Sequence, residues 1–454
     1  MNARHRARLR AWTGPVLLLV FLFALLRRSF YSSSYSTQIY VGNKPRLHDQ
    51  HHTLHFTEAQ CRAVFPELNR QLEQIRAEGP FELPYKNRVV LQGKIENGEV
   101  SSQSPTPPSH QRFPPIAHRH PLQLFVLSGA RKGDMSSTML HRQTATLHQL
   151  YRALKASPEI LPNTSFAFGT QDQPVSSAMA YARPVVSPSR KRIFPMPHFS
   201  FWSWPLPFIN SVPAAARAIS AIEEGTPFAE KDPRAVWRGT TWFNSGAGSH
   251  PRLRQELVKA AAGAPWADVQ GLEWTEGGTK AVNAIDIQDF CGYKYVIQTE
   301  GIGYSGRLQF HQLCESVVLS PPLEWLQHTT HLVRPAFSST ILGSRAGFPT
   351  AYERERWPEE FPVNEANMIF VASDWSDLEA IINWLEGHQV VAARIARNQR
   401  KTFHEDGYLS PAAEACYWRS LLRVWAELAR PVGKEWEQQG TPVEEFIAGR
   451  EDGH

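Results

Sequence analysis

Cysteine is scarce in this sequence. Four cysteines occur in 454 residues, at positions 61, 291, 314 and 416, and no two of them form a Cys-x-x-Cys pair. Zinc sites built on closely spaced cysteines and thioredoxin-like redox motifs are therefore excluded. The four cysteines permit three disulfide pairings, with free buried thiols as the alternative, and the sequence does not choose among these states.

The net charge of the sequence is also small for its length. Lys and Arg total 48, Asp and Glu total 43, and the formal net charge is +5, part of which lies in the N-terminal segment. This balance does not indicate a nucleic-acid partner, although it is compatible with an anionic substrate. The sequence contains no internal repeat, and its length suits two or three domains.

Long apolar runs are absent apart from one near the N-terminus. Residues 12–26 are uncharged and apolar, with basic residues before them and Arg27 and Arg28 after them. The run is shorter than the roughly 20 residues that usually span a bilayer, so a cleaved signal peptide is the alternative. No small-residue cleavage site follows it. We therefore expect an uncleaved anchor over residues 12–28, with a cytosolic tail of residues 1–11 and a luminal body, in the Golgi or endoplasmic reticulum membrane.

The most informative segment runs from Tyr293 to Ser320 and reads as a strand, a glycine turn, an amphipathic helix and a second strand. Gly301, Gly303 and Gly306 allow the backbone to come close to a ligand, and the start of a helix offers unpaired N–H groups to phosphate. Arg307 adds a positive charge at the same place. The segment predicts a phosphate site.

Two other interpretations of this turn remain open. The order Gly301-Ile-Gly303-Tyr-Ser-Gly306 also matches the dinucleotide fingerprint, with Glu324 at a suitable distance for a ribose contact. A luminal nicotinamide-dependent oxidoreductase is therefore an alternative function. An ordinary strand-to-helix turn without a ligand is the other alternative.

Two further strand ends carry polar residues that suit chemistry, because ligands in open α/β sheets bind at the carboxyl ends of strands. One predicted strand ends in Arg238, Gly239 and Thr240, and the arginine fork suits a diphosphate. Another is followed by Asp172, whose carboxylate can take a proton from an acceptor hydroxyl. An aspartate just before Pro174 is by itself also typical of a turn.

Several motifs in order resemble the CAP10-like glycosyltransferases, a family of fungal capsule xylosyltransferases and animal protein O-glucosyltransferases that act on EGF repeats. The resemblance covers roughly residues 57–428 and rests on Phe194-Pro-Met-Pro-His-Phe-Ser-Phe-Trp-Ser-Trp, Trp237-Arg-Gly-Thr, Tyr293-Lys-Tyr, Gly303-Tyr-Ser-Gly-Arg-Leu, and Asp377-Leu with Trp384. It implies an α/β fold of GT-B type with two Rossmann-like lobes facing a cleft, a UDP-sugar donor, no tightly bound cofactor and no obligatory metal. The absence of an Asp-x-Asp motif agrees with the last point.

The domain boundaries follow from this resemblance together with the alternation of strand and helix patterns. A stem of residues 29–56 precedes an N-terminal acceptor lobe of residues 57–205 and a C-terminal nucleotide-sugar lobe of residues 206–405. A helix of residues 406–430 is expected to cross back to the N-terminal lobe. Residues 431–454 are expected to form a tail.

Carried over to this sequence, the catalytic base of the family falls on Asp172 of Gln-Asp-Gln-Pro, and the diphosphate-binding arginines fall on Arg238 and Arg307. The rest of the donor pocket is expected from Gly239, Thr240, Gly303, Tyr304 and Ser305. The loop after Thr240 departs from the family pattern, which puts the contact made by Arg252 or Arg254 in doubt. Glu300 stands where many relatives have an aspartate.

The function predicted from the sequence is the inverting transfer of a sugar, xylose or glucose, from a UDP-sugar to a hydroxyl of a glycan or protein in the secretory pathway. Asp172 would deprotonate the acceptor while Arg238 and Arg307 stabilise the leaving diphosphate. A catalytically silent glycan-binding relative is a further alternative. The expected partners are the donor, the acceptor and, through the anchor, the membrane.

Overall fold

The strands of the C-terminal half are apolar on both faces, which is typical of a parallel sheet covered by helices. In the computed structural model Tyr295 and Leu319 point to one core and Val296 and Val318 to another. The structure describes residues 50–86, 90–96, 123–129, 134–186, 192–244, 250–344 and 347–451. The expected anchor lies outside these residues and stays a prediction. None of the described helices combines the length and the apolar character that crossing a membrane requires.

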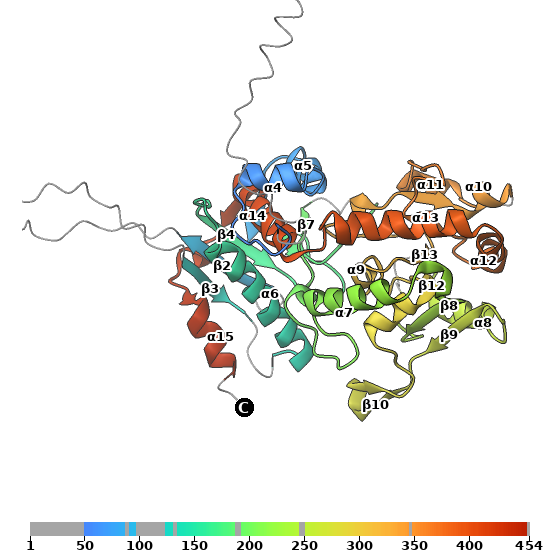
Figure 1. Cartoon of the computed structure of the whole chain (residues 1–454). Helices are drawn as coiled ribbons and strands as arrows, with labels where there is room; N and C mark the ends of the chain where they lie inside the picture. Colours follow the sequence, from blue (N-terminus) through green and yellow to red (C-terminus); the bar gives the residue numbers. More distant parts are fainter. Residues whose placement is uncertain are drawn as a thin grey trace, which may run out of the picture. The chain divides into compact units, whose positions relative to one another are not determined.

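The first of two six-stranded sheets in the described residues has the order β15-β16-β13-β12-β8-β9, and all its pairings are parallel. Its strands are β8 (Asp232–Gly239), β9 (Ala267–Gly271), β12 (Tyr293–Ile297), β13 (Val317–Ser320), β15 (Pro335–Phe337) and β16 (Met368–Phe370). Around it in Figure 1 lie α7 (Val212–Gly225), α8 (Leu253–Ala260), α9 (Leu308–His311), α10 (Ser338–Leu342), α11 (Ala351–Arg356), α12 (Leu378–Gly387) and α13 (Gln389–Arg400).

The second sheet has the order β18-β3-β2-β4-β5-β7 and is mixed. Only β4, β5 and β7 pair in parallel, whereas β2 is antiparallel to both β3 and β4. Two Rossmann-like lobes were expected from the sequence, and the N-terminal sheet differs from that expectation in its antiparallel pairings. The strands are β2 (Leu91–Glu96), β3 (Gln123–Ser128), β4 (Thr164–Phe168), β5 (Ala178–Ala180), β7 (Ile193–Pro195) and β18 (Thr441–Pro442), and helix α6 (Ser137–Lys155) lies between β3 and β4 in the chain.

Helix α14 (Pro411–Leu428) follows α13 through a π-helical turn at Lys401–Glu405 and packs against α6, β4 and two short N-terminal helices, α4 (Glu58–Val64) and α5 (Arg70–Arg76). The remaining short strands pair as β1 (Phe81–Pro84) with β17 (Ala429–Val432), β6 (Arg183–Pro184) with β14 (Trp325–Leu326), and β10 (Trp274–Thr275) with β11 (Lys280–Ala281).

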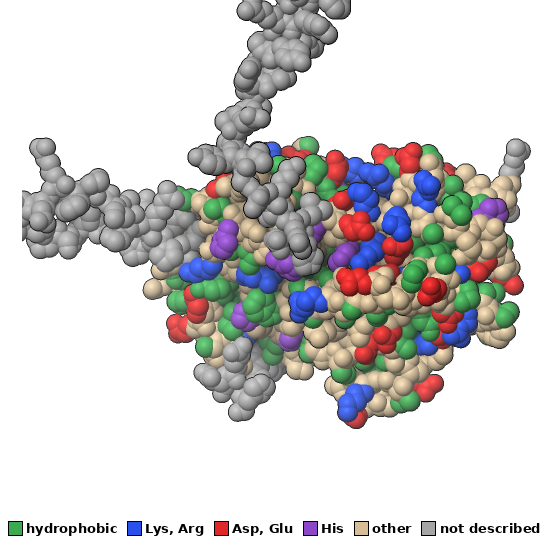
Figure 2. Space-filling view, in the orientation of Figure 1, with side chains coloured by type: hydrophobic (Ala, Val, Ile, Leu, Met, Phe, Trp, Pro, Cys, Tyr) green, Lys and Arg blue, Asp and Glu red, His purple; other side chains and the backbone are tan. Residues whose placement is uncertain are grey.

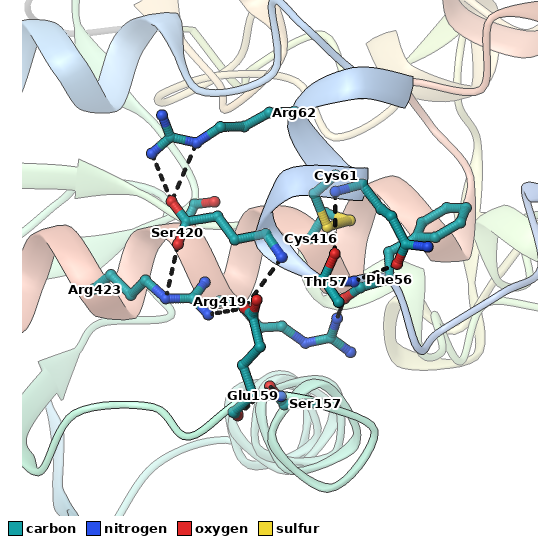
Figure 3. Close-up of polar contacts among 12 residues, drawn as sticks. Phe56, Thr57, Cys61, Arg62, Ser157, Glu159, Cys416, Arg419, Ser420 and Arg423 are labelled. Carbon is teal, nitrogen blue, oxygen red and sulfur yellow. Dashed lines mark hydrogen bonds and ion pairs between the residues drawn. A yellow bond between two sulfur atoms is a disulfide. The ribbon is translucent and has the colours of Figure 1, made fainter. Parts of the chain in front are cut away.

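A disulfide and a polar network hold α4 on α14 (Figure 3). Cys61 is bonded to Cys416. Arg419 donates to backbone carbonyl oxygens of α6 and of the chain before α4, and Arg423 forms an ion pair with Glu159 at 2.7 Å. A second disulfide joins Cys291 to Cys314, so all four cysteines are paired and the alternative of free thiols is wrong.

The segment after residue 430, expected as a tail, forms structure. Strand β18 extends the mixed sheet beside β3, and helix α15 (Val443–Glu451) follows it. Val443 and Ile447 on this helix are buried. These two residues are four apart and therefore share one helical face, which explains how so short a helix is held on the sheet.

Charged side chains of both signs are interspersed over the face shown in Figure 2. Several pairs are well exposed, such as Lys280 with Glu276, in which the side chains are 61% and 59% accessible. Such pairs contribute about 0–1 kcal/mol each. The free energy of folding therefore depends mainly on the two apolar cores and the two disulfides.

The disulfides give a first prediction. The bonded cysteines are 355 residues apart in Cys61–Cys416 but 23 residues apart in Cys291–Cys314. The chain-entropy model therefore predicts that removing the first bond by double serine substitution costs about 2 kcal/mol more than removing the second. Urea unfolding of the two double variants measures the difference, and equal losses would contradict the entropic explanation.

Candidate active site

A cavity of about 1200 Å³ opens between the ends of the two sheets. One wall comes from the end of β8, the glycine turn after β12 and helix α8. The opposite wall comes from α6, the loop after β4 and helix α15. The predicted residues Asp172, Arg238, Gly239, Thr240, Tyr304, Ser305 and Arg307 all line this cavity. Folding therefore brings together residues that are more than a hundred positions apart in the sequence.

Asp172 follows β4 and is held by an arginine that the sequence analysis did not identify. Arg142 Nη1 of helix α6 lies 2.8 Å from Asp172 Oδ1 and also donates to the carbonyl oxygen of Thr170. Burial opposes the charge on Arg142, yet the neighbouring Tyr304 and Asp172 raise its pKa above the usual value. The Asp172 side chain remains 37% accessible and faces the cavity. Arg142 thus fixes the carboxylate while leaving it open to a substrate.

Gly303 brings the two walls together at this carboxylate. A methyl group on Gly303 would lie 2.2 Å from the backbone carbonyl oxygen of Asp172, far inside contact distance. Only glycine fits at this approach. Gly303 was expected in the donor pocket, but it is not among the residues that line the cavity, and a side chain there would meet the backbone of the candidate base.

Arg307 is buried beside the cavity. Its Nη1 donates to the backbone carbonyl oxygen of Arg238. Among the described residues no carboxylate forms an ion pair with it, and burial lowers its pKa to about 10. The guanidinium is therefore a poorly solvated charge, which an anion in the cavity would stabilise.

Arg254 is a second poorly solvated charge beside the cavity. The sequence left open whether Arg252 or Arg254 contributes to this site, because the loop after Thr240 departs from the family pattern. Arg254 is 6% exposed and donates to the carbonyl oxygens of Glu300 at 3.0 Å and Thr240 at 2.9 Å. Burial, and next the charge of Arg307, lower its pKa to about 9. Arg252 instead has a side chain that is 77% exposed and pairs with Glu256. Arg254 is therefore the residue of this loop that reaches the cavity.

Arg238 reaches the cavity wall, but its guanidinium is largely engaged within the protein. It forms an ion pair with Asp268 at 2.7 Å and donates to the carbonyl oxygens of Asp268, Asn283 and Trp237. Tyr293 donates to the other oxygen of Asp268. These contacts fix the end of β8, and a direct contact of Arg238 with diphosphate stays a prediction.

The glycine turn itself differs from the expected phosphate loop. The helix that follows, α9, has only four residues, so its dipole is small. Ser305 and Tyr304 face the cavity, and burial raises the pKa of Tyr304, which keeps the phenol neutral. Thr240 Oγ1 accepts a hydrogen bond from the Trp274 indole at 2.8 Å. Positive charge at the site therefore comes from arginines rather than from a helix end.

Glu324, the acidic residue that a dinucleotide site would need for its ribose, has other contacts in the structure. Glu324 forms an ion pair with Arg356 at 3.4 Å, and its backbone N–H donates to Glu300. Glu324 lines a separate, smaller pocket. It does not line the large cavity, where the ribose of a dinucleotide would need a carboxylate.

One metal-like cluster occurs among the described residues, formed by Glu223, Cys291 and Cys314. The two cysteines are bonded to each other and so do not offer thiolates. None of the three residues lines the cavity.

Part of the chain is similar to known glycosyltransferases. Residues 134–337 match Glycosyl transferase family 90. An "O-glucosyltransferase rumi homolog" of Aedes aegypti is 25% identical over 151 residues, 33% of this chain and 30% of that protein. An "O-glucosyltransferase rumi homolog" of Anopheles gambiae is 25% identical over 204 residues, 44% of this chain and 43% of that protein. The chain thus spans less than half the length of these relatives. Together with the ordered motifs, these matches support a relationship of the chain to the CAP10-like glycosyltransferases.

Proposed function

We propose that this chain is an inverting glycosyltransferase that moves a sugar from a UDP-sugar to an acceptor hydroxyl. The observation that carries the proposal is the arrangement of opposite charges across one cavity. Arg254 and Arg307, both buried and without a carboxylate partner among the described residues, lie on one wall, and Asp172 lies on the other.

The two arginines suit a leaving diphosphate. Each guanidinium is desolvated by the protein, and the two positive charges repel each other. Binding of a doubly negative diphosphate offsets both the desolvation and the repulsion. The same charges stabilise the negative charge that develops on the diphosphate as the sugar departs. They supply what a divalent cation supplies in other sugar-nucleotide enzymes, so we propose that a metal is not required.

Asp172 suits the role of general base. The ion pair with Arg142 fixes one carboxylate oxygen, and among the described residues no hydrogen bond is made to the other. That oxygen is available to take the proton of an acceptor hydroxyl. A single base opposite the leaving group leads to inversion at the sugar carbon. Among the described residues that line the cavity, Glu445 of helix α15 is the other carboxylate, and we assign it no nucleophilic role.

The two-sheet arrangement supports a GT-B-type organisation, with the parallel sheet as the donor lobe and the mixed sheet as the acceptor lobe. The two disulfides suit an oxidising compartment. We therefore place the enzyme in the secretory pathway, anchored by residues 12–28 as a single-pass type II protein. Xylose and glucose remain the proposed sugars, and a glycan or a protein the proposed acceptor.

Arg254→Ala tests the donor site. We expect the affinity for UDP to fall roughly tenfold or more, since a hydrogen bond to a charged group contributes about 1.5–3 kcal/mol. Arg252→Ala is the matched control, because that side chain starts the same helix but is exposed. Titration calorimetry with UDP measures both. Equal affinities in two folded variants would remove Arg254 from the donor site.

Asp172→Asn tests catalysis. We expect transfer to fall ~10²–10⁴-fold, the usual contribution of a positioned general base. The UDP affinity should not fall, because Asp172 is not one of the cations that suit the diphosphate and its negative charge acts on Arg254. Initial rates and UDP titration on the same variant separate the two effects. A turn aspartate without a chemical role predicts little loss, since asparagine keeps the turn.

Gly303→Ala tests the contact between the walls. The added methyl group would displace the backbone of Asp172, and a displacement of about an ångström at a reacting group costs ~10²-fold in rate. Gly292→Ala is the control, because its methyl group meets nothing within 4 Å. If Gly303→Ala keeps wild-type turnover, the close approach has no part in positioning the base.

A further inference from the structure

Helix α15, at the C-terminal end of the chain, forms part of the cavity wall. Strand β18 places it there by pairing with β3, with Thr441 opposite Val126 and Pro442 opposite Phe125. The helix then packs against β3 and α6 (Figure 1). Glu445, Phe446, Gly449 and Arg450 line the cavity.

The helix presents distinct faces. Val443 and Ile447, four residues apart, are buried in the core. Glu445 and Gly449, also four apart, are exposed and face the cavity. Glu444 points elsewhere and accepts a hydrogen bond from the Tyr151 hydroxyl. The core face therefore fixes which residues of α15 meet the cavity.

Arg450 connects this helix to the helix that carries the partner of the base. Its guanidinium donates to Gln143 Oε1 at 2.7 Å and to Thr144 Oγ1 at 3.2 Å, and lies 4.3 Å from the Phe446 ring centre. Gln143 and Thr144 directly follow Arg142, which holds Asp172. The wall formed by α15 is thus continuous with the structure that positions the base.

The cavity has room for more than a donor. Its volume of about 1200 Å³ exceeds the roughly 300–1,000 Å³ of most small-molecule sites. The arginines that suit diphosphate lie on the β8 and β12 side, so the part between α6 and α15 is left for the acceptor. Its lining offers hydroxyl groups, a carboxylate and an aromatic ring, from Ser137, Thr138, Thr441, Glu445 and Phe446.

We propose that α15 is the acceptor-binding wall and that the acceptor is a carbohydrate, bound between the start of α6 and the Glu445–Gly449 face of α15. This inference rests on the proposed transferase function. A carboxylate accepts hydrogen bonds from sugar hydroxyls, neighbouring hydroxyl side chains both donate and accept, and an aromatic ring packs on the apolar face of a sugar. Asp172 lines the same cavity as these residues, so an acceptor lying there would share the cavity with the candidate base.

The test fills this part of the cavity without disturbing the fold. A Cβ on Gly449 meets nothing within 4 Å, so Gly449→Phe extends into open space. Ala448→Phe is the matched control, because Ala448 is exposed, lies next in sequence and does not line the cavity. Glu445→Gln, with Glu444→Gln as control, tests the carboxylate.

Three measurements are made on the full chain: UDP affinity, hydrolysis of UDP-xylose and UDP-glucose in water, and transfer to methyl glycosides and to a serine-containing peptide. We expect Gly449→Phe and Glu445→Gln to lower kcat/KM for a glycoside acceptor about tenfold or more, as for other changes of a specificity pocket. UDP affinity and donor hydrolysis should not change, and the two controls should match the wild type.

Each outcome decides between the two proposals. Unchanged glycoside transfer by Gly449→Phe, in an enzyme that still hydrolyses donor, overturns the acceptor wall and leaves the proposed function standing. Transfer to the peptide but not to any glycoside overturns the carbohydrate assignment. A wild-type chain that neither binds UDP nor hydrolyses either donor overturns the proposed function itself.

Discussion

The contact between Gly303 and the backbone of Asp172 is the constraint on which the site depends. The donor-side turn and the loop of the candidate base come from different sheets, and at this point no side chain separates them. Arg142 then fixes the carboxylate from α6, while Gly301 and Gly306 allow Arg254 and His198 to pack closely against the same turn. Without this approach the two walls would still enclose a cavity, but base and cations would lie farther apart.

The charge that the site offers to a ligand depends on which arginines lack a carboxylate partner within the described part of the protein. Arg238 and Arg142 are both paired with carboxylates, Arg238 with Asp268 at the end of β8 and Arg142 with Asp172. Arg254 and Arg307 donate only to backbone carbonyl oxygens in the described residues. Carbonyl oxygens satisfy hydrogen bonds but do not neutralise charge, so these two arginines retain the attraction for an anion.

The segment after residue 430, which lies beyond the family resemblance, forms strand β18 and helix α15, although a tail was expected there. Val443 and Ile447 are the signal that could have corrected this, since their spacing of four residues marks one apolar helical face. Two apolar residues are too few to identify a packed helix without knowledge of the sheet that they meet. The mixed order of the N-terminal sheet was missed for a similar reason: a strand pattern does not state its partner.

The sequence by itself determined the alternation of strands and helices, the glycine turn, the aspartate after β4 and the resemblance to CAP10-like glycosyltransferases, because periodicity and short motifs are local properties. Only the tertiary structure decided that Gly303 faces Asp172, that Arg142 holds this carboxylate, and that Arg254 rather than Arg252 reaches the cavity. It also assigned the cysteines to their pairs. These facts depend on distances between residues far apart in the chain. Burial and pairing set the charge available to a ligand, and neither is encoded in a motif.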